Sequence, residues 1–389
     1  MNHPAPPRFG AADSQKRLED DRLLRGTGLF NDDRRFDNET AIVFVRSPHP
    51  HARVLTIDTE AARAMPGVIA VYTHADLAAA GLRPIPGNPG FKRPDGADMS
   101  VPPRLGLAAD TVRYVGQTVA AVVADTRMAA VDAAEQVMVD YDPLPAVVDA
   151  RAAMAPDAPQ LWPEAPGNVA AAARYGDAAA VDAAFAKAAH VTHLVMHNQR
   201  LVANPIEPRC VIANVEEGRL VLYTSSQTPT GTRQLLTEGV FGIGVKDARI
   251  VVGDIGGGFG MKTGLSPEEV CACFAARALG RPVRWRADRS EEFLAAHQGR
   301  DQSFDAALAF DGEGRILAMR MQLVAAFGAE PIGTTALIPI ILSPKVATTV
   351  YRVPVVDYDV RGVLTNTMTI GAYRGAGRPE TNYLMERMI

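Results

Sequence analysis

Cysteine is scarce in this chain of 389 residues, and its three cysteines exclude the disulfide framework of a small secreted protein. Apolar runs long enough to cross a membrane are lacking as well. The net charge is only −4, which gives no electrostatic case for binding nucleic acid or an anionic membrane. The first residues lack the apolar core of a secretion signal. We therefore expect a cytoplasmic protein that binds neither nucleic acid nor membrane.

Two of the cysteines, Cys271 and Cys273, could form half of a metal site, but their surroundings predict a helix. Ser266 is a typical N-cap residue, Glu269 completes a capping box, and Gly280 ends the helix. Residues two positions apart on a helix do not face each other, and the chain has no second cysteine pair. We therefore expect neither metal ligands nor an iron–sulfur cluster in this chain.

The rest of the composition is that of an ordinary globular protein, with 47% hydrophobic and 22% charged residues. Short apolar runs alternate with helical patterns and predict a mixed α/β (α+β) fold. We expect a loose arm over residues 1–18, a first domain over 19–149, a linker over 150–173 and a second domain over 174–389. The linker is expected because residues 150–168 are rich in alanine and proline and show little periodicity.

Hydrophobic periodicity and turn residues place the individual elements. Helices are expected over 59–65, 126–136, 177–189, 230–241, 266–279 and 288–296. Strands are expected over 41–45, 68–72, 119–124, 137–141, 190–196, 208–215, 219–224, 248–252 and 282–286, with a hairpin formed by 303–310 and 315–324. Residues 83–104 are dense in proline and glycine and predict a long loop.

Two glycine-rich loops carry the strongest functional signal. Residues 254–262 follow an apolar run and hold four glycines within five positions, and residues 371–378 hold three glycines and two arginines. Glycine lets the backbone take positive φ and brings bare N–H groups close to a ligand, and its entropic cost favours a ligand role over a purely structural turn. With the polar triplet 225–227 at the end of another strand, the loops indicate a large anionic cofactor held mostly by backbone amides.

Other interpretations of these loops have less support. The phosphate-binding P-loop requires glycine directly before its lysine, and Met261 precedes Lys262. The dinucleotide-binding fingerprint fails because the glycines do not have its spacing. Arg374 and Arg378 are either solvated surface charges or positioned anion contacts, and taken alone they do not decide between the two. Gln227 by itself is weak evidence, because polar residues are common at strand ends.

Taken jointly, residues 204–209, 225–230, 256–262 and 371–380 resemble the molybdopterin-binding large subunit of the xanthine dehydrogenase/aldehyde oxidase/carbon monoxide dehydrogenase family. Residues 17–26 and 112–124 resemble the hammerhead α/β domain at the N-terminus of that subunit. The resemblance extends over about 17–389. It implies that 19–149 is the hammerhead domain and that 174–389 is the first part of the molybdopterin cofactor-binding domain, incomplete at the C-terminus.

The resemblance also implies a cofactor and a set of site residues. Molybdenum would be held by the dithiolene of molybdopterin, often in its cytosine dinucleotide form, with no metal ligand from the protein. Gln227 resembles the glutamine that hydrogen-bonds an oxygen ligand of molybdenum, and Phe259 lies in a loop that packs beside the metal. Catalytic roles are implied for Gln227, Phe259 and Arg374. Cofactor binding is implied for Gln227, Gly257, Gly258, Phe259, Gly260, Ala372, Tyr373 and Arg374.

In that family a Mo–OH oxygen attacks an electron-poor carbon while hydride passes to a terminal sulfido group. Electrons then leave through iron–sulfur clusters and FAD on partner subunits, so an iron–sulfur subunit and a FAD subunit are implied as partners. Carbon monoxide oxidisers carry cysteine where Gly375 stands. Purine oxidisers carry glutamate where Thr263 stands and an aromatic residue where Ala376 stands. The resemblance therefore favours aldehydes or other N-heterocycles as substrates.

The family's catalytic base is a glutamate near the C-terminus of a subunit about twice as long, and no glutamate in this chain matches its motif. General-base catalysis needs such a group within hydrogen-bond reach. The resemblance thus implies an enzyme that is inactive unless another chain supplies the C-terminal half. Residues 381–389, which predict a helix that stops without a cap, favour truncation or a split subunit. The alternative is a non-catalytic remnant or scaffold that keeps the fold.

Three remaining groups have plainer interpretations. His190, His193 and His197 are expected to be surface or packing histidines, because positions 190 and 193 of a strand point to opposite faces. Glu207 and Arg209 are expected to belong to a structural turn near the cofactor rather than to act in catalysis. The charged cluster at 288–292 is expected to be a helix N-terminus.

Overall fold

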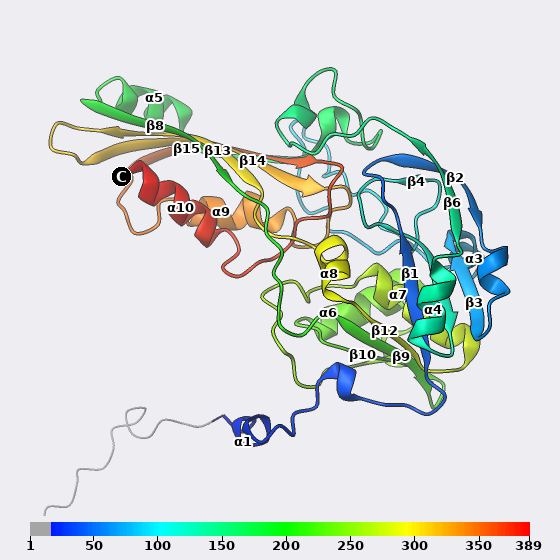
Figure 1. Ribbon diagram of the computed structural model, residues 1–389. Coiled ribbons are helices and arrows are strands. Elements are labelled where there is room, and N and C mark those ends of the chain that lie inside the picture. The colour runs from blue at the N-terminus through cyan, green and yellow to red at the C-terminus, as the bar shows by residue number, and fades with distance from the viewer. Residues whose placement is uncertain (1–16) are drawn as a thin grey trace, which may run out of the picture.

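The computed structural model describes residues 17–389 and contains two large β-sheets joined by loops, with a small sheet beside the larger one (Figure 1). The arm predicted over 1–18 lies almost entirely outside these residues. None of the helices in the described part of the chain combines the length and apolar character that a bilayer crossing needs.

The larger sheet has seven strands in the order β11-β10-β9-β12-β1-β5-β3. The strands are β1 (Thr40–Arg46), β3 (Val68–Thr73), β5 (Thr118–Ala124), β9 (Cys210–Glu216), β10 (Arg219–Thr224), β11 (Ala248–Val251) and β12 (Val283–Arg286). Helix α7 (Pro267–Leu279) packs on this sheet, and Leu107, Leu222 and Trp285 lie in the core between them. Because β1 pairs in parallel with β12, the sheet joins strands from both predicted domains.

A three-stranded sheet in the order β4-β2-β6 lies beside the larger one. It is formed by β2 (Ala52–Asp58), β4 (Thr111–Val112) and β6 (Met138–Pro143). The helices of this region are α2 (Glu60–Arg63), α3 (His74–Ala79) and α4 (Arg127–Ala134). Helix α4 packs on β1 and β5, and all seven residues of β5 are buried.

The second large sheet has five strands in the order β7-β15-β14-β13-β8. They are β7 (Val169–Gly176), β8 (His190–Asn198), β13 (Gln302–Phe310), β14 (Ile316–Gly328) and β15 (Val355–Leu364). Helix α5 (Ala178–Phe185) covers one face through Val181, and α9 (Ser343–Lys345) and α10 (Arg378–Met388) lie on the other (Figure 1). Phe304, Met319 and Leu384 belong to the core on that second face.

The remaining elements are short. They are α1 (Asp20–Leu24), α6 (Pro229–Gln234), α8 (Arg289–Ala295), the 3-10 turns η1 (Asn31–Asp33), η2 (Ala152–Met154), η3 (Pro166–Asn168) and η5 (Val245–Asp247), and the π-helices η4 (Leu235–Phe241) and η6 (Leu337–Leu342). The helix expected over 230–241 therefore begins as α6 and continues as η4.

Several sequence predictions are confirmed, and several elements were missed. Helix α7 begins after Ser266, whose side chain accepts a hydrogen bond from the Glu269 amide at 3.3 Å, and ends at Gly280 with φ +63°. Strands β2, β7 and β15 and helix α3 were not predicted. The stretch expected to be a linker, 150–173, contributes Leu161 and Trp162 to a core and contains most of β7. It is therefore more than a connection.

Candidate functional site

The first glycine loop, residues 256–262, follows β11 and uses conformations that side chains disfavour. Gly257 and Gly260 have φ values of +100° and +99°. Phe259 has φ +53°, and a left-handed residue with a side chain costs on the order of 1–2 kcal/mol. Backbone strain of this kind persists where surrounding contacts determine the conformation, and it is common at functional sites.

The second glycine loop, residues 371–378, leads into α10 and lies against the first. The Arg374 amide donates to the Phe259 carbonyl at 2.9 Å. A Cβ on Gly260 would overlap the carbonyl of Ala372. The structure thus brings together two loops that are more than 100 residues apart in the sequence, and glycine at position 260 is what permits the contact.

Gln227 lies three residues after the end of β10 and joins the same assembly. Its backbone amide donates to the Lys262 carbonyl at 2.7 Å, and its Oε1 accepts from the Gly260 amide at 2.8 Å. A backbone N–H can only donate, so the Gln227 atom that faces it must be the carbonyl oxygen. The side chain is exposed, and its NH₂ group remains available as a donor.

Backbone amides supply further donors at this site. The amides of Gly257, Gly258 and Phe259 in the first loop, and of Ala372 and Tyr373 in the second, have no hydrogen-bond acceptor among the described residues. Such groups suit an anion, because they bring positive partial charge without side-chain bulk. The residues present therefore fit an anionic cofactor such as molybdopterin.

The two candidate arginines have different surroundings. The Arg374 guanidinium is exposed and lies 5.5 Å from the centre of the Phe259 ring. Arg378 is the first residue of α10, and its guanidinium donates to the Gly375 carbonyl at 3.2 Å. Of the two, Arg374 therefore adjoins both loops, whereas the recorded contact of Arg378 is with its own loop.

Residues 297–300 hold the second loop in place, and the sequence interpretation missed them. The Gly371 amide donates to the Gln298 carbonyl at 2.7 Å. The buried Arg300 donates to the carbonyls of Tyr373 and Arg374 at 3.2 and 2.7 Å, and to the carboxylate of Glu380 at 2.8 Å. Gly299 was an available signal, because a Cβ there would overlap the Tyr373 side chain.

His297 touches the first loop from the same segment. Its Nε2 donates to the Gly260 carbonyl at 3.1 Å. Burial lowers the pKa of His297 to about 4, and the nearby charges of Arg104 and Arg209 act in the same direction. The ring is therefore neutral near pH 7 and has one N–H to donate.

A pocket of about 770 Å³, its open mouth included, lies beside residues 261–265, at the end of the first loop and just after it. Its lining combines charged side chains with hydroxyl, apolar and aromatic groups. It includes Arg104, Arg209, Ser225, Ser226, Lys262, Thr263, Glu269, Trp285, His297 and Ile332. Thr263 Oγ1 donates to the Gly260 carbonyl at 2.8 Å, so the hydroxyl nearest the loop is already bonded.

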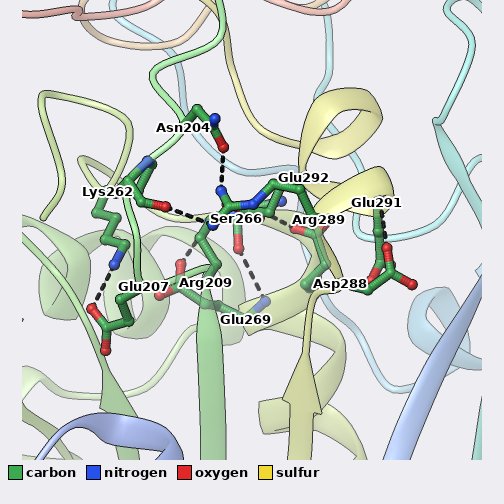
Figure 2. A network of polar contacts seen from close by, with 12 residues as sticks. Asn204, Glu207, Arg209, Lys262, Ser266, Glu269, Asp288, Arg289, Glu291 and Glu292 are labelled. Atoms are coloured by element: carbon green, nitrogen blue, oxygen red, sulfur yellow. Dashed lines mark hydrogen bonds and ion pairs between the residues drawn. The ribbon is translucent and has the colours of Figure 1, made fainter. Parts of the chain in front are cut away.

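Glu207 and Arg209 lie in a turn that adjoins the first loop, and they belong to a buried polar network (Figure 2). Arg209 bonds Glu292 at 2.8 Å and Glu268 at 3.2 Å, and its guanidinium lies 4.9 Å from the centre of the Trp285 ring. Burial raises the pKa of Glu268, but the charges of Arg209 and Arg46 outweigh it and lower the pKa to about 2. These contacts support a structural turn.

The other sequence candidates have structural roles. Cys271 and Cys273 are buried in α7, and burial raises the pKa of both thiols well above the ordinary value. Within 17–389 no cluster of three or more histidine, cysteine or acidic side chains could hold a metal. His193 and His197 are surface residues of β8 that contact Asp305 and Ser303 at 2.8 and 3.1 Å. Asp288 caps α8 by accepting from the Glu291 amide at 2.8 Å.

The loops define a site that binds an anionic ligand largely through backbone amides, and comparison with known proteins gives it a family. The model for the molybdopterin cofactor-binding domain matches residues 161–389. The model for the aldehyde oxidase and xanthine dehydrogenase a/b hammerhead domain matches residues 25–145. The chain therefore belongs to the family of molybdopterin-binding large subunits that includes xanthine dehydrogenase, aldehyde oxidase and carbon monoxide dehydrogenase. The predicted family and fold class are confirmed.

Individual relatives have similar sequences and structures. The large subunit of nicotine 6-hydroxylase from Paenarthrobacter nicotinovorans is 36% identical over 369 residues, which cover 93% of this chain and 44% of the relative. The large chain of carbon monoxide dehydrogenase from Afipia carboxidovorans is 36% identical, and the match covers 98% of this chain and 48% of the relative. The crystal structure of quinoline 2-oxidoreductase from Pseudomonas putida 86 matches with a TM-score of 0.86 at 34% identity. The match covers 96% of this chain and 48% of that chain. The chain spans about half the length of the curated relatives it matches.

Proposed function

We propose that this chain forms the N-terminal part of the catalytic subunit of a molybdenum hydroxylase, and that its two glycine loops bind molybdopterin in the cytosine dinucleotide form. The observation that carries the proposal is the direct contact between the loops, with five amides beside it that have no acceptor among the described residues. When bound, the cofactor would supply the oxidative hydroxylation chemistry. The protein's own residues would bind it, orient it and keep its position fixed.

Each predicted site residue has a distinct part in this proposal. Gln227 directs its NH₂ group to an oxygen acceptor, because its carbonyl oxygen is already bonded to Gly260. Phe259 covers one side of the site with a ring held in a strained backbone conformation. Arg374 contributes a cation beside that ring. The free amides of Gly257, Gly258, Ala372 and Tyr373 bind the negatively charged part of the cofactor.

We propose aldehydes or N-heterocycles as the substrate class. Position 263 carries a threonine, whose hydroxyl is bonded to the Gly260 carbonyl, in place of the glutamate of purine oxidisers. Two relatives are named for N-heterocyclic compounds, nicotine and quinoline, which supports the second class. We further propose that an iron–sulfur subunit and a FAD subunit are the electron-transfer partners. The catalytic base would come from polypeptide that corresponds to the second half of the relatives. The proposed location is the cytoplasm.

Metal and pterin analysis tests the proposal. The protein is co-expressed with its partner subunits and the cofactor maturation proteins, and another molybdenum enzyme made in the same cells serves as the control. We expect about one molybdenum and one pterin per chain. A protein without molybdenum beside a loaded control would contradict the proposal. A loaded protein that oxidises neither aldehydes nor N-heterocycles would favour the non-catalytic scaffold.

A further inference from the structure

Glu207 is a half-buried acidic residue in the turn between β8 and β9, and its carboxylate accepts three hydrogen bonds. Oε2 accepts from the Gly256 amide at 2.8 Å and from the Lys262 ammonium at 2.6 Å. Oε1 accepts from the Ser225 hydroxyl at 3.0 Å. Figure 2 shows the Glu207 and Lys262 side chains directed toward each other.

The three donors lie at particular points of the candidate site. Gly256 and Lys262 are the first and last residues of the first glycine loop, and Ser225 is two residues before Gln227. The backbone repeats this arrangement, because the Glu207 amide donates to the Gly256 carbonyl at 3.1 Å and the Gln227 amide donates to the Lys262 carbonyl at 2.7 Å. One carboxylate therefore ties both ends of the loop to the segment that carries Gln227.

The glycine at position 256 has its explanation in this contact. Its φ is not positive, so the backbone conformation does not require glycine there. A Cβ on Gly256 would come within 2.5 Å of the Glu207 Cβ, which is closer than side chains can approach. Gly256 therefore makes room for Glu207, whereas Gly257 and Gly260 are needed for positive φ.

Lys262 is part of the same arrangement. Its side chain is 2% exposed, and Glu207 is its only ion-pair partner among the described residues. A buried ammonium needs a counter-charge, because an unpaired charge is strongly disfavoured away from water. The lysine of the first loop thus holds the loop in place through Glu207, and its charge is not free for an external anion.

We propose that Glu207 is a positioning residue, which holds the free amides of the first loop and the NH₂ group of Gln227 in one fixed arrangement relative to each other. The inference rests on the proposed function, since the arrangement matters for turnover only if the loops bind the cofactor. Glu207 is not itself a catalytic residue. Partners that orient a site typically change affinity or activity by about 10- to 100-fold when they are removed.

The test uses Glu207→Gln in the holoenzyme assembled with its partner subunits. Hydrogen exchange measured by mass spectrometry reports the mobility of the peptide covering 256–263, and steady-state kinetics report kcat and KM. We expect exchange in that peptide to rise about 10-fold while peptides of the five-stranded sheet are unchanged. We expect kcat to fall about 10- to 100-fold with a smaller change in KM.

Glu292→Gln is the matched control. Glu292 is a buried carboxylate of the same network that bonds Arg209 at 2.8 Å, and it has no recorded hydrogen bond to the first loop. The Glu292→Gln substitution should lower the thermal midpoint without raising hydrogen exchange in the peptide covering 256–263. The double variant Glu207→Gln with Lys262→Met removes the unpaired ammonium, so it should regain thermal stability while exchange in the loop stays high.

Loop exchange in Glu207→Gln equal to that of the wild type would overturn the inference. So would a double variant that regains kcat together with stability, because the role would then be structural only. Failure of the proposed function is a separate result. An assembly without molybdenum would contradict the proposed function. The comparison of hydrogen exchange between wild type and variants would still test whether Glu207 holds the loop.

Discussion

Gln227 and Arg374 contribute to the proposed site through different groups, so their substitutions should have different effects. Gln227→Ala removes one neutral donor, and loss of such a donor typically lowers kcat about 100-fold. Molybdenum and pterin content should stay near that of the wild type. Arg374→Ala removes a cation beside Phe259 and should lower both cofactor content and turnover. Both are measured on the assembled enzyme by metal analysis and kinetics.

Arg378→Ala is the control for the charge, because Arg378 bonds the carbonyl of Gly375 in its own loop. We expect it to change cofactor content less than Arg374→Ala does. Equal losses in the two arginine variants would mean that net charge, rather than the position of Arg374, matters. Unchanged turnover in Gln227→Ala would contradict the role assigned to its NH₂ group.

Glu330 gives a pH-dependent prediction. Its buried carboxyl accepts from Gln117 Nε2 at 2.7 Å, and burial raises its pKa to about 7 despite the charges of Arg104 and Arg113. The folded state therefore binds this proton more tightly than the unfolded state, in which the pKa is near the ordinary value of 4.5. The resulting stability is present below about pH 4.5 and is lost as pH rises through 7.

We therefore expect the free energy of unfolding of the wild type, relative to Glu330→Gln, to fall by up to about 3 kcal/mol between pH 5 and pH 8. Glutamine keeps a neutral group of the same shape, so the difference isolates the titration. Urea unfolding of the two proteins at pH 5, 6.5 and 8 measures it. A difference that does not change with pH would show that Glu330 titrates normally.

At the scale of elements, contact between the two loops can be tested by comparing a glycine of the first loop with one just after it. Gly260 and Gly264 both have positive φ, +99° and +79°, so alanine at either position costs roughly 1–2 kcal/mol in backbone strain. Only Gly260 faces the second loop, and a Cβ on Gly264 has no neighbour within 4 Å. Gly260→Ala should therefore lose most of its molybdenum and pterin, whereas Gly264→Ala should keep them.

The test is the molybdenum and pterin content of the two purified variants, compared once their thermal midpoints have been shown to be equal. Equal retention in both would mean that close contact between residue 260 and Ala372 is not required. Equal loss would indicate that strain alone disturbs the site.

Elements with local signals were predictable, and those that depend on distant partners were not. Ser266 and Gly280 mark the ends of α7 in the sequence, and both act there as caps. Strand β15 was missed, and Gly362 within it is normally a strand-weakening residue. In the structure a Cβ at position 362 would overlap the Phe327 ring of β14, so the glycine is required by a neighbour that the local sequence does not reveal.

The same distinction applies to the candidate site. The glycine loops and Gln227 carry recognisable motifs, and their mutual contact follows from the resemblance. The roles of Arg300, His297 and Glu207 depend on hydrogen bonds to carbonyls and amides far along the chain. Neither spacing nor composition encodes such contacts, so Arg300 and His297 emerged only from the fold. Glu207 was expected from the sequence only as part of a structural turn near the cofactor. The functional roles of the predicted site residues stay predictions.

For the molecule as a whole, the seven-stranded sheet and a buried charge network join the hammerhead region to the cofactor-binding region. Glu268 of α7 lies between Arg46 of β1 and Arg209, at 2.9 and 3.2 Å. Removing its charge leaves Arg46 with Glu291, and Arg209 with Glu292, as the remaining ion-pair partners. Glu268→Gln should therefore lower the free energy of unfolding by about 2–3 kcal/mol, the loss expected for hydrogen bonds to charged groups.

Because β1 pairs with β12, we expect both regions to unfold together in one calorimetric transition, in the wild type and in this variant. Glu313→Gln is the control, since Glu313 and Arg315 form an exposed pair in the β13–β14 turn. It should change stability by less than about 1 kcal/mol. Two separate transitions, or a Glu268 effect no larger than that of Glu313, would contradict this account of how the regions are joined.

The central claim is that the two glycine loops enclose the molybdenum cofactor, and anomalous diffraction tests it directly. Data collected from crystals of the assembled protein on both sides of the molybdenum absorption edge locate the metal without reference to any assigned role. The account predicts one peak per chain, next to Gln227 and between residues 256–262 and 371–378. A molybdenum peak away from both loops, or no peak in protein that contains molybdenum by elemental analysis, would contradict it.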